Sequence, residues 1–364
     1  MFKMKKKILI TGCGGYLGSY LIHFLLKKNY LIQGYDIGFF KECNLFENKN
    51  LSDHINLKDA KDIKLEDLQN CDVVVHLAGI SNDPLNKLTS AKVYDPTREY
   101  TLNIAKMCKS LNKKFIFASS CSVFGAAKTE NYLTEMSETS PQTGYSLNKL
   151  QIEEDLKLIS DLKFSPICLR FATIFGVSSR IRFDVVINML VGMALTQGEI
   201  KLNSNGEAWR PHLYIKDACG AILHFIEYEK KNKNDKISII NIGRNDNNIK
   251  IIDVAKIIQE LVPGTKIKFI NNSNENSKEQ LFTDRKIKEG HDSTTYKVLF
   301  DLLENEFGFK CKYTVKDGIY EMIENFNKIK FDDKIFKFKG FYRLQYLENL
   351  HEKNLIDDNL KWKN

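Results

Sequence analysis

Tyr145 and Lys149 are the residues of this chain whose types and spacing most directly suggest chemistry. A separation of four places both side chains on one face of a helix. A phenol titrates near pH ~10, and a neighbouring ammonium favours its deprotonated form. The Tyr145 hydroxyl could then exchange a proton with an alcohol or carbonyl group of a substrate during a redox step. Of the 15 tyrosines, Tyr145 alone has Lys four positions later, although a solvated helix pair would show the same spacing.

Hydroxyl side chains follow an apolar run that predicts a strand over Phe115–Ser119. Ser120 and Ser122 would then lie at the carboxyl edge of a sheet, where a serine can hydrogen-bond a substrate oxygen and the tyrosine. Serines after a strand are more often loop or cap residues. Their position upstream of the Tyr145–Lys149 pair favours a functional role.

A glycine-rich turn, Thr11-Gly12-Cys13-Gly14-Gly15-Tyr16-Leu17-Gly18, lies between a predicted strand and a predicted helix. Glycines spaced three apart allow tight dihedral angles and a close approach of the backbone to a pyrophosphate. The helix N-terminus offers N–H groups to the same phosphates. We therefore predict dinucleotide contacts from the turn residues Gly12, Gly15, Tyr16, Leu17 and Gly18.

Asp36 ends the next predicted strand, Leu31–Tyr35. A carboxylate there can accept hydrogen bonds from the adenosine ribose and repel a 2′-phosphate, which favours NAD over NADP. Lys41 keeps NADP open as an alternative, and an Asp that merely caps a loop is the structural alternative.

Strand and helix patterns alternate through the first half of the chain. Strands are predicted over Ile8–Ile10, Leu31–Tyr35, Val73–Leu77, Phe115–Ser119, Ile167–Phe171 and Ile237–Ile242; helices over Tyr20–Lys28, Tyr94–Leu111, Ser146–Ile159 and Phe341–Leu350. This order predicts an α/β fold with a doubly wound parallel sheet. We expect a dinucleotide-binding domain over 1–170 to which 211–244 returns, a smaller substrate-binding lobe over 171–210 and 245–330, a polar loop at Asn271–Ser277, and a C-terminal extension over 331–364.

Composition narrows the class of protein. The 364 residues carry a net charge of +8, with lysines spread over many short runs, which favours solvated faces and an anionic small substrate over nucleic acid. No apolar run approaches membrane-spanning length. The eight cysteines form no C-x-x-C pair, so we expect reduced thiols, a cytoplasmic location and no metal site.

Over about residues 7–325 the chain resembles the extended short-chain dehydrogenase/reductase family of nucleotide-sugar epimerases and dehydratases. The matching strings are the glycine turn, Asp59-Ala60-Lys61-Asp62, His76-Leu77-Ala78-Gly79, Ser119 to Gly125, Tyr145 with Lys149, and Leu169 to Gly176. The resemblance implies that Tyr145 is the acid/base, that Lys149 holds the nicotinamide ribose and tunes Tyr145, and that Ser120 orients the substrate. It also implies adenine contacts from Asp59 and Ala60, and pyrophosphate and ribose contacts from Leu77, Ala78 and Gly79.

The resemblance also points to residues for the sugar nucleotide. Arg182 and Arg210 suit a diphosphate because a guanidinium gives bidentate hydrogen bonds, while Arg180 could equally be a surface charge. The loop containing Ser81 and Asn82 follows a strand and is expected to reach the sugar, with a plain turn as its alternative. Ser120, Ser122 and Thr173 complete the predicted substrate contacts.

Departures from the family pattern narrow the reaction. Its 4,6-dehydratases carry Asp-Glu immediately after the triad Ser/Thr, whereas Cys121 and Ser122 stand here. We therefore expect redox chemistry at one carbinol or keto carbon, at C4, by epimerisation, keto reduction or net oxidation. The alternatives are a 4,6-dehydratase with an atypical acid and a non-catalytic dinucleotide sensor. Family relatives pair through the helices that match Tyr94–Leu111 and Tyr145–Ile159, which predicts a homodimer or a higher homo-oligomer and leaves Leu147, Leu150 and Ile152 as candidate contacts.

Overall fold

The computed structural model describes residues 5–47, 49–81, 90–125, 131–229, 236–270 and 295–363. Asn82 and the polar loop Asn271–Ser277 lie outside the described residues. A seven-stranded sheet forms the centre of the larger lobe, in the order β11-β7-β5-β4-β1-β2-β3, and every neighbouring pair is parallel. The α/β prediction is therefore confirmed.

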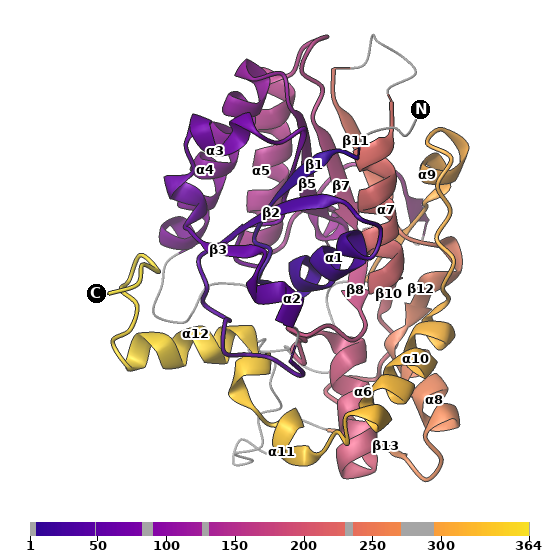
Figure 1. Ribbon diagram of the computed structural model, residues 1–364. Helices are drawn as coiled ribbons and strands as arrows, with labels where there is room; N and C mark the ends of the chain where they lie inside the picture. Colours follow the sequence, from indigo (N-terminus) through magenta and orange to yellow (C-terminus); the bar gives the residue numbers. More distant parts are fainter. Residues whose placement is uncertain are drawn as a thin grey trace.

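The strands of this sheet are β1 (Lys7–Thr11), β2 (Leu31–Asp36), β3 (Ile55–Leu57), β4 (Val73–His76), β5 (Lys114–Ser120), β7 (Ile167–Phe171) and β11 (Ser238–Ile242). The central strands are apolar because helices cover both faces of the sheet. Helices α3 (Leu65–Gln69), α4 (Ser90–Ser110) and α5 (Gly144–Ile159) cover one face, and α1 (Tyr16–Leu26) and α7 (Ile215–Glu227) the other, as Figure 1 shows. Short α2 (Lys49–Ser52) precedes β3.

A smaller lobe lies beyond the carboxyl ends of the sheet strands (Figure 1). It contains a three-stranded sheet, β12-β10-β8, a parallel pair β13-β9, and helices that share a second apolar core. Its elements are β8 (Thr173–Phe175), α6 (Val186–Gln197), β9 (Glu199–Leu202), β10 (Trp209–Tyr214), β12 (Asn248–Lys250), α8 (Ile251–Leu261), β13 (Lys266–Phe269), α10 (Val315–Lys328) and α11 (Asp333–Phe336). Strands β6 (Tyr132–Leu133) and β14 (Lys297–Val298) pair separately, followed by α9 (Asp301–Asn305).

Hydrogen bonds join the two lobes at the glycine turn. The Tyr16 hydroxyl donates to the Gly176 carbonyl at 2.6 Å, and the Ser19 and Ser178 hydroxyls lie 2.8 Å apart. The Arg180 guanidinium donates to the Gly14 carbonyl at 2.8 Å and is 7% exposed. Arg180 is thus a buried link between the lobes rather than a surface charge.

The C-terminal residues form α12 (Arg343–Glu352) and a short hairpin closed by a bridge between Ile356 and Trp362. This segment packs on the loop after β2, beside the larger lobe (Figure 1). The predicted helix Phe341–Leu350 is present with its start and end shifted by two residues. Helix α1 begins at Tyr16, four residues before the predicted start, because Gly15 already occupies the N-cap position with extended backbone.

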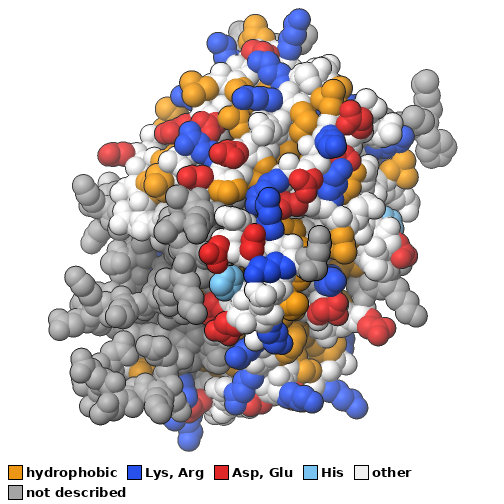
Figure 2. Space-filling model, turned by 90° about the vertical axis from the view of Figure 1, so that its left-hand side faces the viewer, with side chains coloured by type: hydrophobic (Ala, Val, Ile, Leu, Met, Phe, Trp, Pro, Cys, Tyr) orange, Lys and Arg blue, Asp and Glu red, His pale blue; other side chains and the backbone are white. Residues whose placement is uncertain are grey.

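On the face shown in Figure 2, basic and acidic side chains are interspersed rather than gathered by sign. No helix among the described residues is both long and apolar enough to cross a membrane.

Candidate active site

One cavity of about 770 Å³ lies at the carboxyl ends of the central strands, between the two lobes. Parallel α/β sheets bind ligands at this edge. All predicted site residues within the described part of the chain line it: Gly12, Gly15, Tyr16, Leu17, Gly18, Asp36, Asp59, Ala60, Leu77, Ala78, Gly79, Ser81, Ser120, Ser122, Tyr145, Lys149, Thr173, Arg182 and Arg210. Sequence reasoning therefore grouped residues that the fold brings together.

The glycine turn forms the floor of this cavity and fits a dinucleotide. Gly12 has a φ of +68°, and a Cβ there would lie 2.6 Å from the Ala78 backbone nitrogen. A Cβ on Gly18 would lie 2.5 Å from the Gly12 carbonyl oxygen, so two backbone segments meet without side chains between them. Gly15 caps α1 with no side-chain hydrogen bond, so no side chain of its own covers the helix end from which a phosphate can accept hydrogen bonds.

Asp36 joins the glycine turn to the loop after β2. Its carboxylate accepts hydrogen bonds from the backbone N–H groups of Gly14 at 2.9 Å and Gly38 at 2.8 Å. Burial raises the pKa of Asp36, while the two N–H groups and the Arg180 charge act in the opposite direction. Each carboxylate oxygen can accept a second hydrogen bond, so Asp36 can still accept one from a ribose hydroxyl.

Tyr145 and Lys149 lie in the first turns of α5, which Thr143 caps through a bond from the Ser146 N–H. The Lys149 ammonium donates to the Ala118 carbonyl at 2.7 Å and lies 5.7 Å from the centre of the Tyr145 ring. Burial lowers the pKa of Lys149 to about 8. This lysine therefore connects α5 to the end of β5 directly beside the tyrosine.

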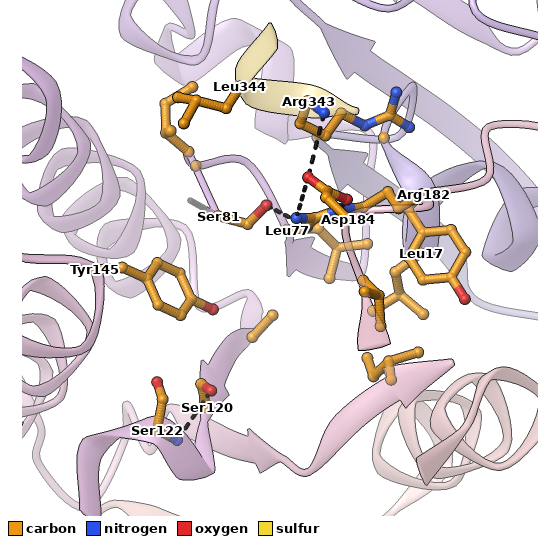
Figure 3. Close-up of a pocket in the computed structure, with 18 of the residues that line it drawn as sticks. Leu17, Leu77, Ser81, Ser120, Ser122, Tyr145, Arg182, Asp184, Arg343 and Leu344 are labelled. Atoms are coloured by element: carbon orange, nitrogen blue, oxygen red, sulfur yellow. Dashed lines mark hydrogen bonds and ion pairs between the residues drawn. The ribbon is translucent and has the colours of Figure 1, made fainter. Parts of the chain in front are cut away.

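The Tyr145 hydroxyl faces the interior of the cavity, and Ser120 and Ser122 lie on the same side (Figure 3). Burial raises the pKa of Tyr145, while the nearby Ser120 hydroxyl and the charge of Arg182 act in the opposite direction. Besides Lys149, which the sequence suggested as the tuning cation, Arg182 of the second lobe therefore also acts on the Tyr145 hydroxyl.

The two residues that follow Ser120 differ in their surroundings. Cys121 is 1% exposed, donates to the Arg170 carbonyl and does not line the cavity, and burial raises the pKa of its thiol. Ser122 lines the cavity, and its buried hydroxyl has no hydrogen-bond partner among the described residues. Ser122 is thus available to a ligand, and Cys121 is not.

Across the cavity from Tyr145, an ion pair holds Arg182 in place (Figure 3). Its guanidinium donates to both oxygens of Asp184 at 2.8 and 3.0 Å, and to the Ser81 hydroxyl at 2.6 Å. Farther along the cavity, the Arg210 guanidinium lies 5.7 Å from the centre of the Tyr296 ring. Both guanidinium groups line the cavity, where they could donate hydrogen bonds to a sugar diphosphate, while Asp184 beside Arg182 balances the charge of that arginine.

A buried ion pair supports α5 behind the site. Arg170 donates to Glu153 at 2.7 Å, and the Ser119 hydroxyl donates to the same carboxylate at 2.5 Å. Sequence reasoning did not single out Glu153, although it lies four residues after Lys149. It also missed the C-terminal residues that line the cavity, which no local motif marks: Tyr342, Arg343, Leu344, Gln345, Leu347, Asn359 and Leu360.

The fold and the cavity together define a Rossmann-type dinucleotide-binding protein with a second lobe over the ligand site. A family model described as "NAD dependent epimerase/dehydratase family" matches residues 8–243. The chain belongs to this family.

Two curated proteins share between 27% and 29% of their aligned residues with this chain. The bifunctional polymyxin resistance protein ArnA of Wigglesworthia glossinidia brevipalpis is 27% identical over 307 residues, covering 76% of this chain and 43% of the relative. This chain therefore spans less than half the length of that relative. The UDP-N-acetyl-alpha-D-glucosaminuronate decarboxylase of Bacillus cytotoxicus is 29% identical over 268 residues, covering 71% of this chain and 81% of the relative.

Solved structures confirm the fold. The NAD-dependent NDP-hexosamine 5,6-dehydratase TunA aligns with a TM-score of 0.72 at 20% identity, covering 89% of this chain and 98% of its own. The UDP-glucuronic acid 4-epimerase of Bacillus cereus, solved with UDP-glucuronic acid and NAD, aligns with a TM-score of 0.69 at 20% identity, covering 89% and 99%.

Proposed function

We propose that this protein is an NAD-dependent oxidoreductase or epimerase that acts on a nucleotide-diphosphate sugar at a single carbinol or keto carbon, C4. The observation that carries the proposal is the arrangement of Tyr145, Ser120 and Lys149 around one cavity that also contains the glycine turn. The relatives whose names include NAD or UDP-sugars support this class of ligands.

Bound NAD would supply the hydride acceptor. The residues of this chain would do the rest: Ser120 orients the substrate hydroxyl, and the Tyr145 oxygen accepts its proton as the carbinol is oxidised. Burial raises the pKa of Tyr145 overall, and the charge of Arg182 offsets part of that rise. The Tyr145 hydroxyl would then return the proton to the same oxygen as the hydride is returned to the ketone carbon, on the opposite face for an epimerase.

Tyr145→Phe tests this assignment because it removes the hydroxyl and keeps the ring. We expect turnover to fall by about 10²–10⁴-fold while the Kd for NADH stays within about twofold. Tyr320→Phe, at an exposed tyrosine that does not line the cavity, is the matched control. Near-wild-type turnover of Tyr145→Phe would refute the triad. Turnover by the wild-type chain would exclude the non-catalytic alternative, which predicts none.

NAD is the proposed dinucleotide because Asp36 lines the cavity where a 2′-phosphate would approach. Lys41, Lys58, Lys61 and Lys361 line a neighbouring cavity and keep NADP in the comparison. Titration with NADH and NADPH decides this point, and tighter binding of NADPH would overturn it.

A 4,6-dehydratase is the second candidate because one of the similar structures is the dTDP-glucose 4,6-dehydratase of Bacillus anthracis, which aligns with a TM-score of 0.68 at 20% identity. Dehydration needs an acid beside the substrate, whereas Ser122 is the residue that lines the cavity after Ser120. Incubation with UDP- and dTDP-hexoses and UDP-uronates, followed by chromatographic separation of the sugar nucleotides and mass spectrometry, distinguishes the two reactions. A 4-keto-6-deoxy product would overturn our choice, and a mass-neutral isomer or a change of two hydrogens would support it.

We further propose a homodimer formed through α4 and α5, as the family resemblance implies. Leu147 is 46% exposed on α5 and can contribute, whereas Ile152 is 1% exposed because it packs in the core of its own chain. Ile152 is therefore excluded as a contact. A monomeric mass in light scattering would refute the dimer.

A further inference from the structure

The C-terminal residues 339–363, named here the C-terminal segment, pack against the edge of the cavity at which Asp36 lies. Their apolar side chains form one cluster with residues of the larger lobe: Phe39, Tyr94, Leu347, Leu350, Ile356 and Leu360, with Ile37, Phe40, Ile80, Tyr145 and Leu344 packed against them. The cluster thus extends from the loop after β2 to Tyr145 itself. A segment outside the matched family region therefore contacts both ends of the dinucleotide site.

Specific polar contacts fix the end of the C-terminal segment. The Trp362 indole N–H donates to the Ile37 carbonyl at 2.7 Å, and its ring lies 5.6 Å from that of Phe39. The Lys363 N–H donates to the Leu355 carbonyl at 2.9 Å and closes the hairpin. Because Ile37 directly follows Asp36, Trp362 anchors the segment beside the proposed adenosine contact.

Arg343 fixes the beginning of α12. This residue is 4% exposed, donates to the Arg180 carbonyl at 2.6 Å, and lies 4.1 Å from the centre of the Phe40 ring. Its backbone N–H donates to Asp184, the partner of Arg182 (Figure 3). The segment is therefore joined to both lobes and to the arginine that faces Tyr145.

Between these two anchors, the segment presents side chains to the cavity. The same cavity that the glycine turn and Asp59 line is also lined by two amide residues, Gln345 and Asn359, and by Leu344, Leu347 and Leu360. A dinucleotide on the glycine turn would thus have the sheet on one side and this segment on another. An additional wall slows ligand departure because the contacts must break before the ligand leaves.

We propose that the C-terminal segment is part of the dinucleotide-binding site, and that release of the dinucleotide requires the hairpin at Trp362 to detach. This inference rests on the dinucleotide site of the proposed function. It deepens that function because a dinucleotide held through both half-reactions suits a redox-neutral reaction, in which the hydride is returned before the dinucleotide leaves.

Hydrogen exchange on the wild-type chain provides the first test. Amides of residues 343–363 should exchange about tenfold more slowly with saturating NADH than without it, because detachment of the segment is then coupled to ligand loss. Amides of α8, outside the cavity apart from Ile251, serve as the internal reference. Unchanged exchange in residues 343–363 at confirmed saturation would overturn the proposal.

Trp362→Ala provides the second test, with NADH release followed by fluorescence after a chase with excess NAD. We expect release to accelerate by about tenfold or more, and Trp362→Phe, which keeps an aromatic ring but loses the indole N–H, to fall between. Tyr320→Ala is the control for loss of an exposed aromatic side chain.

The outcomes separate this inference from the proposed function. If the wild-type chain binds neither NADH nor NADPH, the proposed function fails. If the wild-type chain binds NADH and folded Trp362→Ala releases it at the wild-type rate, the proposal for the segment alone is wrong. If Trp362→Ala does not fold, the Trp362→Phe rate and the wild-type exchange data decide.

Discussion

The two sides of the cavity are built in different ways. The side that carries Tyr145, Ser120 and the glycine turn comes from strand ends and helix starts of one lobe, within short stretches of sequence. The opposite side comes from Arg182, Arg210 and the C-terminal segment, which are distant in sequence from one another. The first side is placed by the central sheet, whereas the second combines a strand of the smaller lobe, which carries Arg210, with segments placed by tertiary packing.

This difference suggests a division of labour. The sheet side holds the groups that would transfer a proton and bind the dinucleotide backbone, so its geometry tolerates little change. The opposite side supplies charge and closure through ion pairs and apolar packing, so substitutions there should alter affinity more gradually. Substitutions on the two sides of the cavity should therefore differ in the size of their effects.

Gly12→Ala should have the largest effect, on the sheet side. A Cβ at Gly12 meets the Leu77–Ala78 backbone at 2.6–2.8 Å, at a φ of +68°. We expect NADH affinity to fall by about 100-fold and the folded state to lose about 2–3 kcal/mol. Fluorescence titration and thermal unfolding measure both.

Gly264→Ala is the matched control, because Gly264 has a φ of +89° but nothing within 4 Å of an added Cβ. It should lose about 1 kcal/mol from backbone strain and keep its NADH affinity. Equal NADH affinity in Gly12→Ala and Gly264→Ala would remove the glycine turn from the binding site.

Arg182→Lys should have an intermediate effect, on the opposite side. Lysine keeps the charge but cannot reproduce the paired bonds to Asp184, so the KM for the sugar nucleotide should rise by about tenfold with NADH affinity unchanged. Steady-state kinetics checks this. Arg244→Lys is the control, since Arg244 also pairs with an Asp two residues later but does not line the cavity. An equal KM in both variants would contradict a substrate role for Arg182.

Lys149 should produce the smallest effect, seen in the pH dependence of stability. Its pKa is about 8 in the folded protein and 10.5 ordinarily, so the unfolded chain binds more protons between these values. Stability contributed by this residue therefore rises as the pH increases from 8 to 10.5 and is constant below 8. Relative to Lys149→Met, the wild-type Tm should rise by about 2–4 °C over that window. A wild-type Tm that falls relative to the variant would contradict the sign.

Much of the sheet side could be predicted from sequence because its signals are local. The apolar runs that become β1, β4 and β5 are buried on both faces, and the residues at their carboxyl ends must share one edge. Asp36 at the end of β2 and Ser120 at the end of β5 could therefore be assigned to one edge without a structure, whereas Tyr145, at the start of α5, was assigned from its spacing to Lys149 and from the family resemblance. Helix α7 was missed, although Ile215, Ala218, Ile222 and Phe225 follow a helical period.

The remaining parts of the site could not be predicted because they depend on long-range packing. The bond from Trp362 to Ile37 joins residues 325 positions apart. The effect of Arg182 on Tyr145 arises only once α5 and the second lobe face each other. The sequence pattern around one residue of each pair gives no information about its distant partner. Neither contact could therefore be predicted from local sequence.

The bonds between Tyr16 and Gly176, and between Arg180 and Gly14, restrict the routes by which a ligand can enter and leave the cavity. They join the lobes beside the proposed pyrophosphate site. Separation of the two lobes would therefore break buried hydrogen bonds next to the bound ligand. Detachment of the C-terminal hairpin is the less costly route, because it leaves the contacts between the two lobes intact. The part of the cavity through which the ligand passes would then be separate from the part around Tyr145. The residues of either part could be substituted without altering the other.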